Sequence, residues 1–174
     1  MTSTIRAYAR RDLEWLLGLN NRFAAEMGVL SVDDIEGFAA LGGALRVASV
    51  RPPEGDEAMR AGFLVLLPSG TAYRSANYRW FETNMTEPFA YIDRVAIDPA
   101  MSGRGLGRAL YEDAEAIAKD WDRRVLTCEV NERPPNPASM AFHRRLGFAA
   151  LETRENAESG KRVVMMEKHL DGVA

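Results

Sequence analysis

Residues 89–110 decide the fold, and they read Phe89-Ala-Tyr-Ile-Asp-Arg-Val-Ala-Ile-Asp-Pro-Ala-Met-Ser-Gly-Arg-Gly-Leu-Gly-Arg-Ala-Leu110. The stretch begins with aromatic and β-branched residues, which favour a strand. Pro99 ends that strand, because proline lacks the N–H that a ladder needs. Gly103, Gly105 and Gly107 follow, and apolar residues then recur at helical spacing from Leu106 to Trp121. The stretch predicts a strand, a glycine-rich turn and a helix with one buried face.

A glycine-rich turn that opens a helix is suited to binding an anion. Glycines let backbone N–H groups approach a phosphate, and the start of a helix favours negative charge. Two nucleotide-binding motifs do not fit. A Walker loop needs Lys and then Ser or Thr where Arg108 and Ala109 stand. The dinucleotide-binding fingerprint is Gly-x-Gly-x-x-Gly near the start of a βαβ unit. Here the spacing is Gly-x-Gly-x-Gly, and the motif comes past the middle of the chain. A tight turn without a ligand is the remaining alternative.

Two sequence blocks carry a resemblance to a known family. Residues 95–110 resemble the acetyl-CoA motif of the GNAT superfamily of N-acetyltransferases, with Gly105 and Gly107 at its two small positions and Ser102 where Arg or Gln is usual. Residues 136–148, Asn-Pro-Ala-Ser-Met-Ala-Phe-His-Arg-Arg-Leu-Gly-Phe, resemble the second block of that family. The resemblance implies an α/β fold with a mixed, largely antiparallel sheet flanked by helices. We expect residues 1–174 to form a single domain of this kind.

The rest of the chain fits an α/β class with a mixed sheet. We expect helices after Asp12 and after Ser31, where Ser31 and Asp34 resemble a capping box. We expect residues 71–88 to be the least regular stretch, and residues 131–135 to form a proline-bearing loop. The predicted strands are 4–8, 44–50, 61–67, 125–130, 148–154 and 162–168, with a polar loop at 51–57 and a turn at 155–160.

Composition narrows the class of protein. The hydrophobic fraction of 47% is enough for a core, and the net charge of −3 does not favour a nucleic acid as partner. Cys128 is the only cysteine, which indicates a reducing compartment without an intrachain disulfide. No apolar run approaches the ~20 residues of a membrane helix, and residues 1–6 lack the apolar core of a signal peptide. We expect a cytoplasmic protein with no membrane partner.

The resemblance implies that acetyl-CoA is the co-substrate, and no metal is expected. Arg104 and Arg108 would face phosphates, because guanidinium pairs well with them; the alternative is two solvated charges. Asn136 could act as an N-cap, as a contact to the pantetheine arm, or as both. The residues expected to bind the cofactor are Val95, Ala96, Ile97, Gly103, Arg104, Gly105, Leu106, Gly107, Arg108, Asn136 and Ser139.

The resemblance also implies two catalytic residues. Glu129 stands just before a valine, where one branch of the family has the glutamate that removes a proton from the amine. The alternatives are a solvated glutamate at position 129 and Asp93 as the base. His143 stands where the family usually has a tyrosine that protonates the CoA sulfur, and an imidazole can do the same. His143 could instead pack, or touch the pantetheine without transferring a proton.

Residues 71–88 hold an aromatic patch. It either covers an edge of the sheet or forms a wall of the acceptor pocket, and in the second case Asn77, Tyr78 and Trp80 bind the substrate. Cys128 is interpreted as a small core residue. The predicted function is transfer of an acetyl group from acetyl-CoA to a primary amine, of a small molecule or a protein, by direct attack in a ternary complex. A non-catalytic acyl-CoA sensor of the same fold is the alternative, and dimers are frequent in the family.

Overall fold

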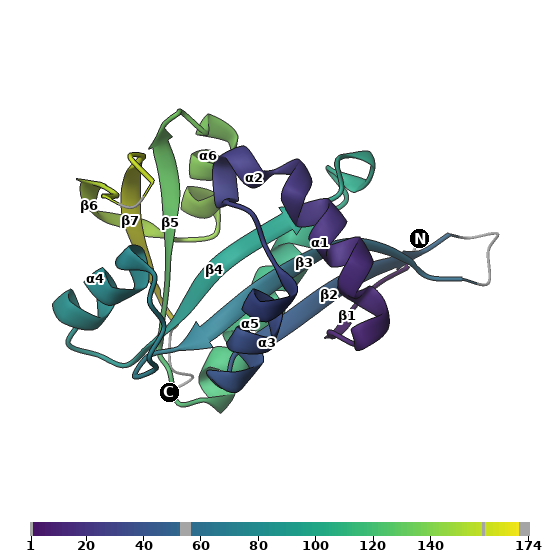
Figure 1. Cartoon of the computed structure of the whole chain (residues 1–174), viewed down its shortest axis with the longest axis horizontal. Coiled ribbons are helices and arrows are strands. Elements are labelled where there is room, and N and C mark those ends of the chain that lie inside the picture. The colour runs from purple at the N-terminus through teal and green to yellow at the C-terminus, as the bar shows by residue number, and fades with distance from the viewer. Residues whose placement is uncertain (1, 53–56, 158, 171–174) are drawn as a thin grey trace. The chain divides into compact units, whose positions relative to one another are not determined.

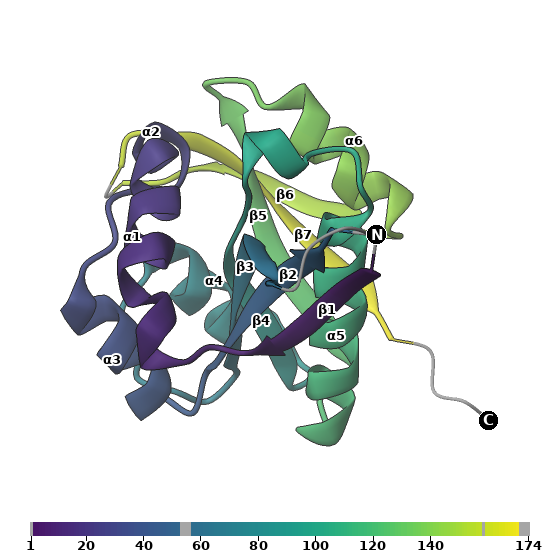
Figure 2. The same ribbon diagram turned by 90° about the vertical axis from the view of Figure 1, so that its right-hand side faces the viewer.

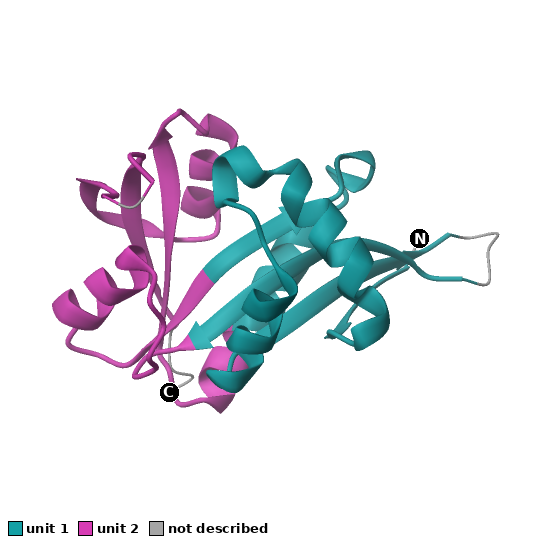
Figure 3. Cartoon of the chain, viewed as in Figure 1, with its two compact units in different colours: residues 1–67, 93–114 teal, residues 68–92, 115–174 magenta. Residues whose placement is uncertain are grey.

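The computed structural model describes residues 2–52, 57–157 and 159–170. The chain forms two compact units, Met1–Leu67 with Asp93–Ala114 and Pro68–Ile92 with Glu115–Ala174 (Figure 3). Among the described residues, one sheet has the strand order β1-β2-β3-β4-β5-β7-β6. Strand β4 (Phe89–Ile97) and helix α5 (Leu106–Asp120) each contribute residues to both units. This is the mixed, mainly antiparallel α/β architecture that the sequence predicts.

The first unit is an antiparallel sheet with helices on two sides. Its strands pair β1 with β2 and β2 with β3, with a bulge between Ala48 and Ser49. Figure 2 shows α1 and α3 on one side of these strands and the start of α5 on the other. Its elements are β1 (Thr2–Ala7), η1 (Arg10–Asp12), α1 (Leu13–Arg22), α2 (Ala24–Met27), α3 (Val32–Ala40), β2 (Ala44–Arg51), β3 (Met59–Pro68) and η2 (Pro99–Met101).

Local sequence explains where α3 begins. Ser31 accepts a hydrogen bond from the backbone N–H of Asp34 at 3.2 Å, and the Asp34 carboxylate accepts one from the backbone N–H of Ser31 at 2.8 Å. This reciprocal pair is the predicted capping box, with Asp in place of Glu. Ile35 and Phe38 then lie one turn apart and are buried. The helix therefore begins at a satisfied end and turns an apolar face inward.

The second unit combines parallel and antiparallel pairing (Figure 1). The start of β4 runs parallel to β5, with Tyr91 opposite Thr127, and β7 pairs antiparallel with both β5 and β6. Phe89, Tyr91, Leu126 and Met165 are buried within this unit. Its remaining elements are α4 (Ala76–Asn84), β5 (Val125–Arg133), α6 (Pro137–Arg145), β6 (Ala149–Glu155) and β7 (Arg162–His169).

Two stretches are more regular than the sequence predicts. Residues 76–84 of the expected irregular stretch form α4, because Ser75 caps it and the buried Tyr78 and Phe81 stand three residues apart. Residues 131–133 of the expected loop extend β5, where Asn131 and Arg133 pair with β7 on either side of an irregularity. Parts of two predicted connections lie outside the described residues, namely 53–56 of the polar loop and 158 of the last turn.

Candidate active site

The glycine-rich turn has the backbone that the sequence predicts. Asp98 caps η2 by accepting a hydrogen bond from the N–H of Ala100 at 3.0 Å, and Pro99 stands at the first position of that short helix. Gly103 and Gly105 both have φ of +75°, a conformation that glycine adopts without strain. A Cβ added at either glycine would meet no heavy atom within 4 Å. The turn is therefore open above its backbone where it leads into α5.

Helix α5 begins directly at this turn. Leu106 and Leu110 are buried and fix the helix against the first unit. Gly107 falls in the first helical turn, whose N–H groups have no acceptor within the helix. Arg104 and Arg108 are exposed, and Arg108 lies 4.0 Å from Glu112, a weak pair in which both side chains are more than 60% exposed. Two guanidinium groups therefore accompany a helix start that favours anions.

The strand before the turn is packed closely on β3. The N–H of Asp98 donates to the carbonyl of Ala61 at 2.8 Å. A Cβ added to Gly62 would lie 2.5 Å from the Ile97 side chain and 2.8 Å from the Ala96 carbonyl oxygen, so only glycine fits there. Ala96 is buried, while Val95 and Ile97 are half-buried. The end of β4 is thus a rigid base for the turn.

Glu129 on β5 is held by two neutral donors of the second unit. The Nδ2 of Asn77 donates to its Oε1 at 2.8 Å, and the Tyr91 hydroxyl donates to its Oε2 at 2.8 Å. Asn77 in turn accepts a hydrogen bond from Asn156 at 3.0 Å. An ionised carboxylate only accepts hydrogen bonds, so these donors suit that form. The Glu129 side chain is half-buried and has a defined orientation rather than that of a solvated strand residue.

Asp93, the alternative base, has a different environment in the first unit. Its carboxylate lies 2.7 Å from the guanidinium of Arg94, and both side chains are nearly buried. Arg94 also donates to the Oδ1 of Asn20 at 3.0 Å and stands over the Phe38 ring. The ion pair with Arg94 thus occupies the Asp93 carboxylate, whereas Asn77 and Tyr91 orient that of Glu129 through hydrogen bonds.

Helix α6 places Asn136, Ser139 and His143 on one side. The Asn136 side chain accepts a hydrogen bond from the N–H of Ser139 at 3.1 Å, so it is the N-cap that the sequence predicts. His143 is buried and lies edge-on to Phe142 and Phe148. Its Nδ1 lies 2.8 Å from the carbonyl oxygen of Ser139, which can only accept, so this nitrogen carries a proton.

Burial determines the charge of His143. It lowers the pKa of the imidazole below its ordinary value, and the hydrogen bond to Ser139 offsets this only in part. The ring is therefore neutral near pH 7, with the proton on Nδ1 and a lone pair on Nε2. Such a ring can accept a hydrogen bond at Nε2, whereas donating a proton from that atom requires the less populated imidazolium.

The three predicted substrate contacts differ in exposure. Tyr78 is buried; its hydroxyl donates to the Pro68 carbonyl at 2.8 Å and accepts from Thr71, and burial raises its pKa. Asn77 is buried against Glu129 and Asn156. Trp80 is half-buried and lies edge-on to Phe81. Of the three, Trp80 has the side chain most able to meet a molecule from solution.

Two residues of this region carry no recognisable signal in the sequence. Tyr91 and Asn156 both belong to the hydrogen bonds around Glu129. Tyr91 reads as an ordinary strand aromatic, and Asn156 as one polar residue of a turn. Only the tertiary structure brings them to Glu129.

Cys128 precedes Glu129 and is buried. Burial raises the pKa of its thiol, and the neighbouring Glu129 charge raises it further. A neutral, enclosed thiol is a poor nucleophile, so Cys128 is a core residue.

Within the described ranges, no group of three or more His, Cys, Asp or Glu residues could hold a metal ion. Nor does any helix there combine the length and apolar character that crossing a bilayer requires.

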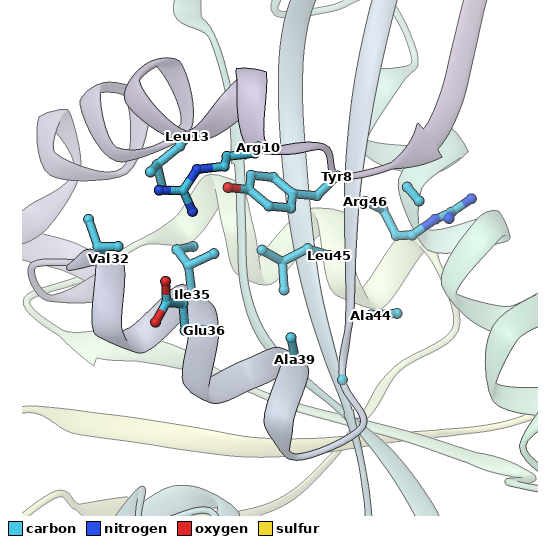
Figure 4. A pocket seen from close by; sticks show the side chains of 12 residues that line it. Tyr8, Arg10, Leu13, Val32, Ile35, Glu36, Ala39, Ala44, Leu45 and Arg46 are labelled. Atoms are coloured by element: carbon cyan, nitrogen blue, oxygen red, sulfur yellow. The ribbon is translucent and has the colours of Figure 1, made fainter.

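A separate pocket of about 360 Å³ lies in the first unit, against α3 and β2 (Figure 4). Figure 4 shows Tyr8, Arg10 and Leu13 on one side of this space, and Ile35 and Glu36 of α3 on the other. Burial raises the pKa of the Tyr8 phenol, and the charge of Arg10 opposes that effect. None of the residues predicted to bind the cofactor lines this pocket.

Known proteins resemble the chain in sequence and in fold. Residues 51–148 match the Acetyltransferase (GNAT) family. An uncharacterized N-acetyltransferase of Methanocaldococcus jannaschii is 30% identical over 93 residues, which are 52% of this chain and 40% of that protein. The chain thus spans less than half the length of this curated relative.

Three solved structures illustrate the likeness in fold. Ard1 from Thermoplasma volcanium has a TM-score of 0.73 at 17% identity, covering 99% of this chain and 100% of that one. The protein yncA from Salmonella typhimurium, solved with its cofactor acetyl-CoA, has a TM-score of 0.69 at 20% identity, covering 99% and 96%. A ribosomal-protein-alanine N-acetyltransferase from Brucella melitensis has a TM-score of 0.66 at 20% identity, covering 96% and 99%.

Proposed function

The chain belongs to the GNAT acetyltransferase family, and we propose that it moves an acetyl group from acetyl-CoA to a primary amine by direct attack in a ternary complex. Acetyl-CoA supplies an activated acyl group as a thioester. The protein must bind that molecule, orient the amine and take up the proton that the amine loses. The observation that carries the proposal is the Glu129 carboxylate, which two neutral donors hold in one orientation.

The glycine-rich turn is the proposed site for the CoA phosphates. Gly103 and Gly105 leave open space above the backbone, and the first turn of α5 offers N–H groups. The exposed Arg104 and Arg108 supply positive charge, and the Glu112 carboxylate lies 4.0 Å from Arg108 as a weak competing anion. This combination fits a pyrophosphate group. Val95, Ala96 and Ile97 form the strand end before the turn, and Asn136 and Ser139 are proposed as contacts to the pantetheine arm.

Glu129 is the proposed general base. An alkyl ammonium, with a pKa near 10, has no lone pair for attack, so the amine must first lose a proton. Glu129 takes up that proton directly or through water, and its hydrogen bonds to Asn77 and Tyr91 keep the carboxylate aimed. As the C–N bond forms, the C–S bond breaks and the departing thiolate takes a proton.

His143 is the proposed source of that last proton, with a modest contribution. Its lowered pKa leaves little imidazolium near pH 7. A CoA thiolate is already a tolerable leaving group, since thiols have pKa values of about 8.5. We therefore expect the base, rather than the acid, to dominate the chemistry.

The acceptor is proposed to be a cationic or neutral primary amine, of a small molecule or of a protein. The second unit carries Glu82, Glu87 and Glu129 on the segments that we assign to the acceptor. Their charge favours a cation over a carboxylate or a phosphate.

An amine panel tests the proposal. The protein is incubated with acetyl-CoA and small amines, polyamines and peptide N-termini, and free thiol is measured over time. We expect thiol release that depends on one class of primary amine and that falls sharply in Glu129→Gln. Binding of acetyl-CoA without turnover on any amine would support the acyl-CoA sensor instead. Best turnover with acidic acceptors would contradict the proposed acceptor class.

A further inference from the structure

Two asparagines of the second unit are connected to the Glu129 carboxylate by hydrogen bonds, Asn77 directly and Asn156 through Asn77. We propose that Asn77 and Asn156 form an amide relay that orients this carboxylate, so that both are positioning residues rather than contacts to the acceptor. The role of this relay in catalysis rests on the proposed function, in which Glu129 is the general base. Its geometry is a property of the second unit alone.

The relay is a continuous chain of hydrogen bonds. The N–H of Ser159 donates to Asn156 Oδ1 at 3.0 Å, Asn156 Nδ2 donates to Asn77 Oδ1 at 3.0 Å, and Asn77 Nδ2 donates to Glu129 Oε1 at 2.8 Å. Its members come from the turn after β6, from α4 and from β5. Both asparagine side chains are buried, so water competes little for these bonds.

The Ser159 end of this chain of hydrogen bonds determines which amide group donates and which accepts in each bond. A backbone N–H can only donate, so the oxygen of Asn156 must face Ser159 and its NH₂ must face Asn77. Asn77 then receives that donor on its oxygen and turns its own NH₂ toward Glu129. The orientation of each amide thus follows from one N–H in a turn. Without Asn156, the Asn77 amide could turn its oxygen toward the carboxylate and repel it.

Tyr91 completes the arrangement from the other side. Its hydroxyl donates to Glu129 Oε2 at 2.8 Å, so each carboxylate oxygen has its own donor. The Asn77 amide therefore already binds Glu129 through its NH₂ group and Asn156 through its oxygen. Its side chain is buried, which makes it less accessible to an acceptor molecule than Trp80.

Several titratable or charged groups lie around Glu129 and can influence the titration of its carboxylate. Tyr91 contacts it from β4, and the Tyr73 ring lies 6.5 Å from that of Tyr91. Cys128 precedes it on β5, and its thiol pKa is raised in part by the Glu129 charge. Arg154 of β6 donates to the Ala76 carbonyl beside Asn77, and α6 carries His143. From β7, the uncharged Met165 is the register partner of Glu129.

The test measures the protonation of Glu129 without any substrate. The full chain, labelled with ¹³C at the glutamate carboxyl, is titrated by NMR, and the Glu129 signal is assigned by its loss in Glu129→Gln. The variants are Asn77→Asp and Asn156→Asp. Asp at 156 keeps the oxygen that Ser159 needs, loses the NH₂ that Asn77 accepts from, and adds a negative charge. Asn84→Asp is the matched control, because it places the same change at an exposed position of α4.

We expect Asn77→Asp to raise the Glu129 midpoint by about one pH unit or more, because two adjacent carboxylates cannot both ionise easily. Asn156→Asp should raise it in the same direction, through rotation of the Asn77 amide and through the added negative charge. Asn84→Asp should leave it at the wild-type value. With the best amine of the panel, the acid limb of the kcat profile should move with each midpoint.

Coincident Glu129 titrations in wild type and both variants would overturn the relay. If Asn77→Asp fails to fold, the Glu129 midpoint in Asn156→Asp, compared with that in wild type, tests the relay by the same criterion. The relay and the base role can fail separately. If the midpoints move but Glu129→Gln keeps the wild-type kcat, the relay holds and Glu129 is not the base. If Glu129→Gln loses activity but no midpoint moves, Glu129 is the base and the relay is wrong.

Discussion

Glu129 and Asp93 show how neighbours distinguish two acidic residues that look alike in the sequence. Asp93 is paired with Arg94, whereas Glu129 accepts hydrogen bonds from Asn77 and Tyr91. The Asp93 carboxylate is occupied by its ion pair, and its side chain is only 5% exposed. The Glu129 side chain is half-buried, and its hydrogen bonds hold the carboxylate in a defined orientation. This difference in partners and exposure is the reason for assigning the base to Glu129.

Glu129→Gln is expected to lower kcat by about 10²-fold or more, the low end for general base catalysis. The amide keeps the size of the side chain but cannot take up the proton. The loss should shrink as pH rises, because free amine then becomes abundant without help. A pH–rate profile with the best acceptor measures both effects. A constant loss at every pH would argue against the base role, and Asp93→Asn with a larger loss would transfer the role to Asp93.

His143→Ala is expected to lower kcat by less than about 10²-fold, which is below the usual range for a positioned acid. The ring is neutral near pH 7 because burial lowers its pKa, so little proton donation is lost. Calorimetry should show nearly unchanged affinity for acetyl-CoA. His143→Tyr, which restores the residue usual in the family, should retain much of the activity. A His143→Ala variant with wild-type kcat would remove this residue from the mechanism.

At the scale of elements, the decisive unit is the end of β4, the turn at 103–105 and the start of α5. The strand end is fixed on β3 at Gly62, where no side chain fits. The turn then reverses direction through two residues with positive φ, and Leu106 anchors the helix. A rigid strand and an anchored helix hold the glycine backbone in place, as an anion site requires.

Gly105→Glu is expected to weaken acetyl-CoA binding at least about tenfold, or about 1.4 kcal/mol. The change adds a side chain and a negative charge where we place the pyrophosphate. Gly42→Glu is the matched control: Gly42 has φ of +74° and no heavy atom near its added Cβ, yet lies at the end of α3. Calorimetry compares the two. Equal affinities in both folded variants would place the phosphates elsewhere.

At the scale of the whole molecule, two buried groups connect stability to pH. Asp12 is 1% exposed and accepts two hydrogen bonds from Arg6, which hold the pKa of its carboxyl below the ordinary 3.8. His143 has a pKa lowered from 6.5 by burial. In both cases the unfolded chain binds a proton at a higher pH than the folded chain does. Acid therefore favours unfolding through both groups.

Urea unfolding of the full chain should show these two contributions in separate pH windows. The free energy of unfolding should fall below about pH 6.5 as unfolded His143 becomes protonated, and again below about pH 4 as unfolded Asp12 does. His143→Gln should flatten the upper window alone. Asp12→Asn should flatten the lower one and cost about 1.5–3 kcal/mol near neutral pH, the usual value of hydrogen bonds to charged groups. Unchanged pH dependence in both variants would contradict this account.

The sequence by itself determined what depends on local pattern. The glycine turn, the caps at Ser31 and Asn136, the strand periods and the family follow from neighbouring residues, because turn and cap geometry is set within a few positions. The helix at 76–84 was missed, since its burial depends on the long-range packing of Tyr78 and Phe81. Glu129 and His143 were candidates by resemblance alone, and their roles remain predictions.

Only the tertiary structure decided which side chains meet. Asn77, Tyr91, Glu129 and Asn156 are up to 79 residues apart in the chain, and the hydrogen bonds among them have no local signature. The neutral state of His143 likewise comes from burial, which no spacing reveals. Desolvation and hydrogen bonding act through space, so the chemistry of a side chain is settled where distant segments pack.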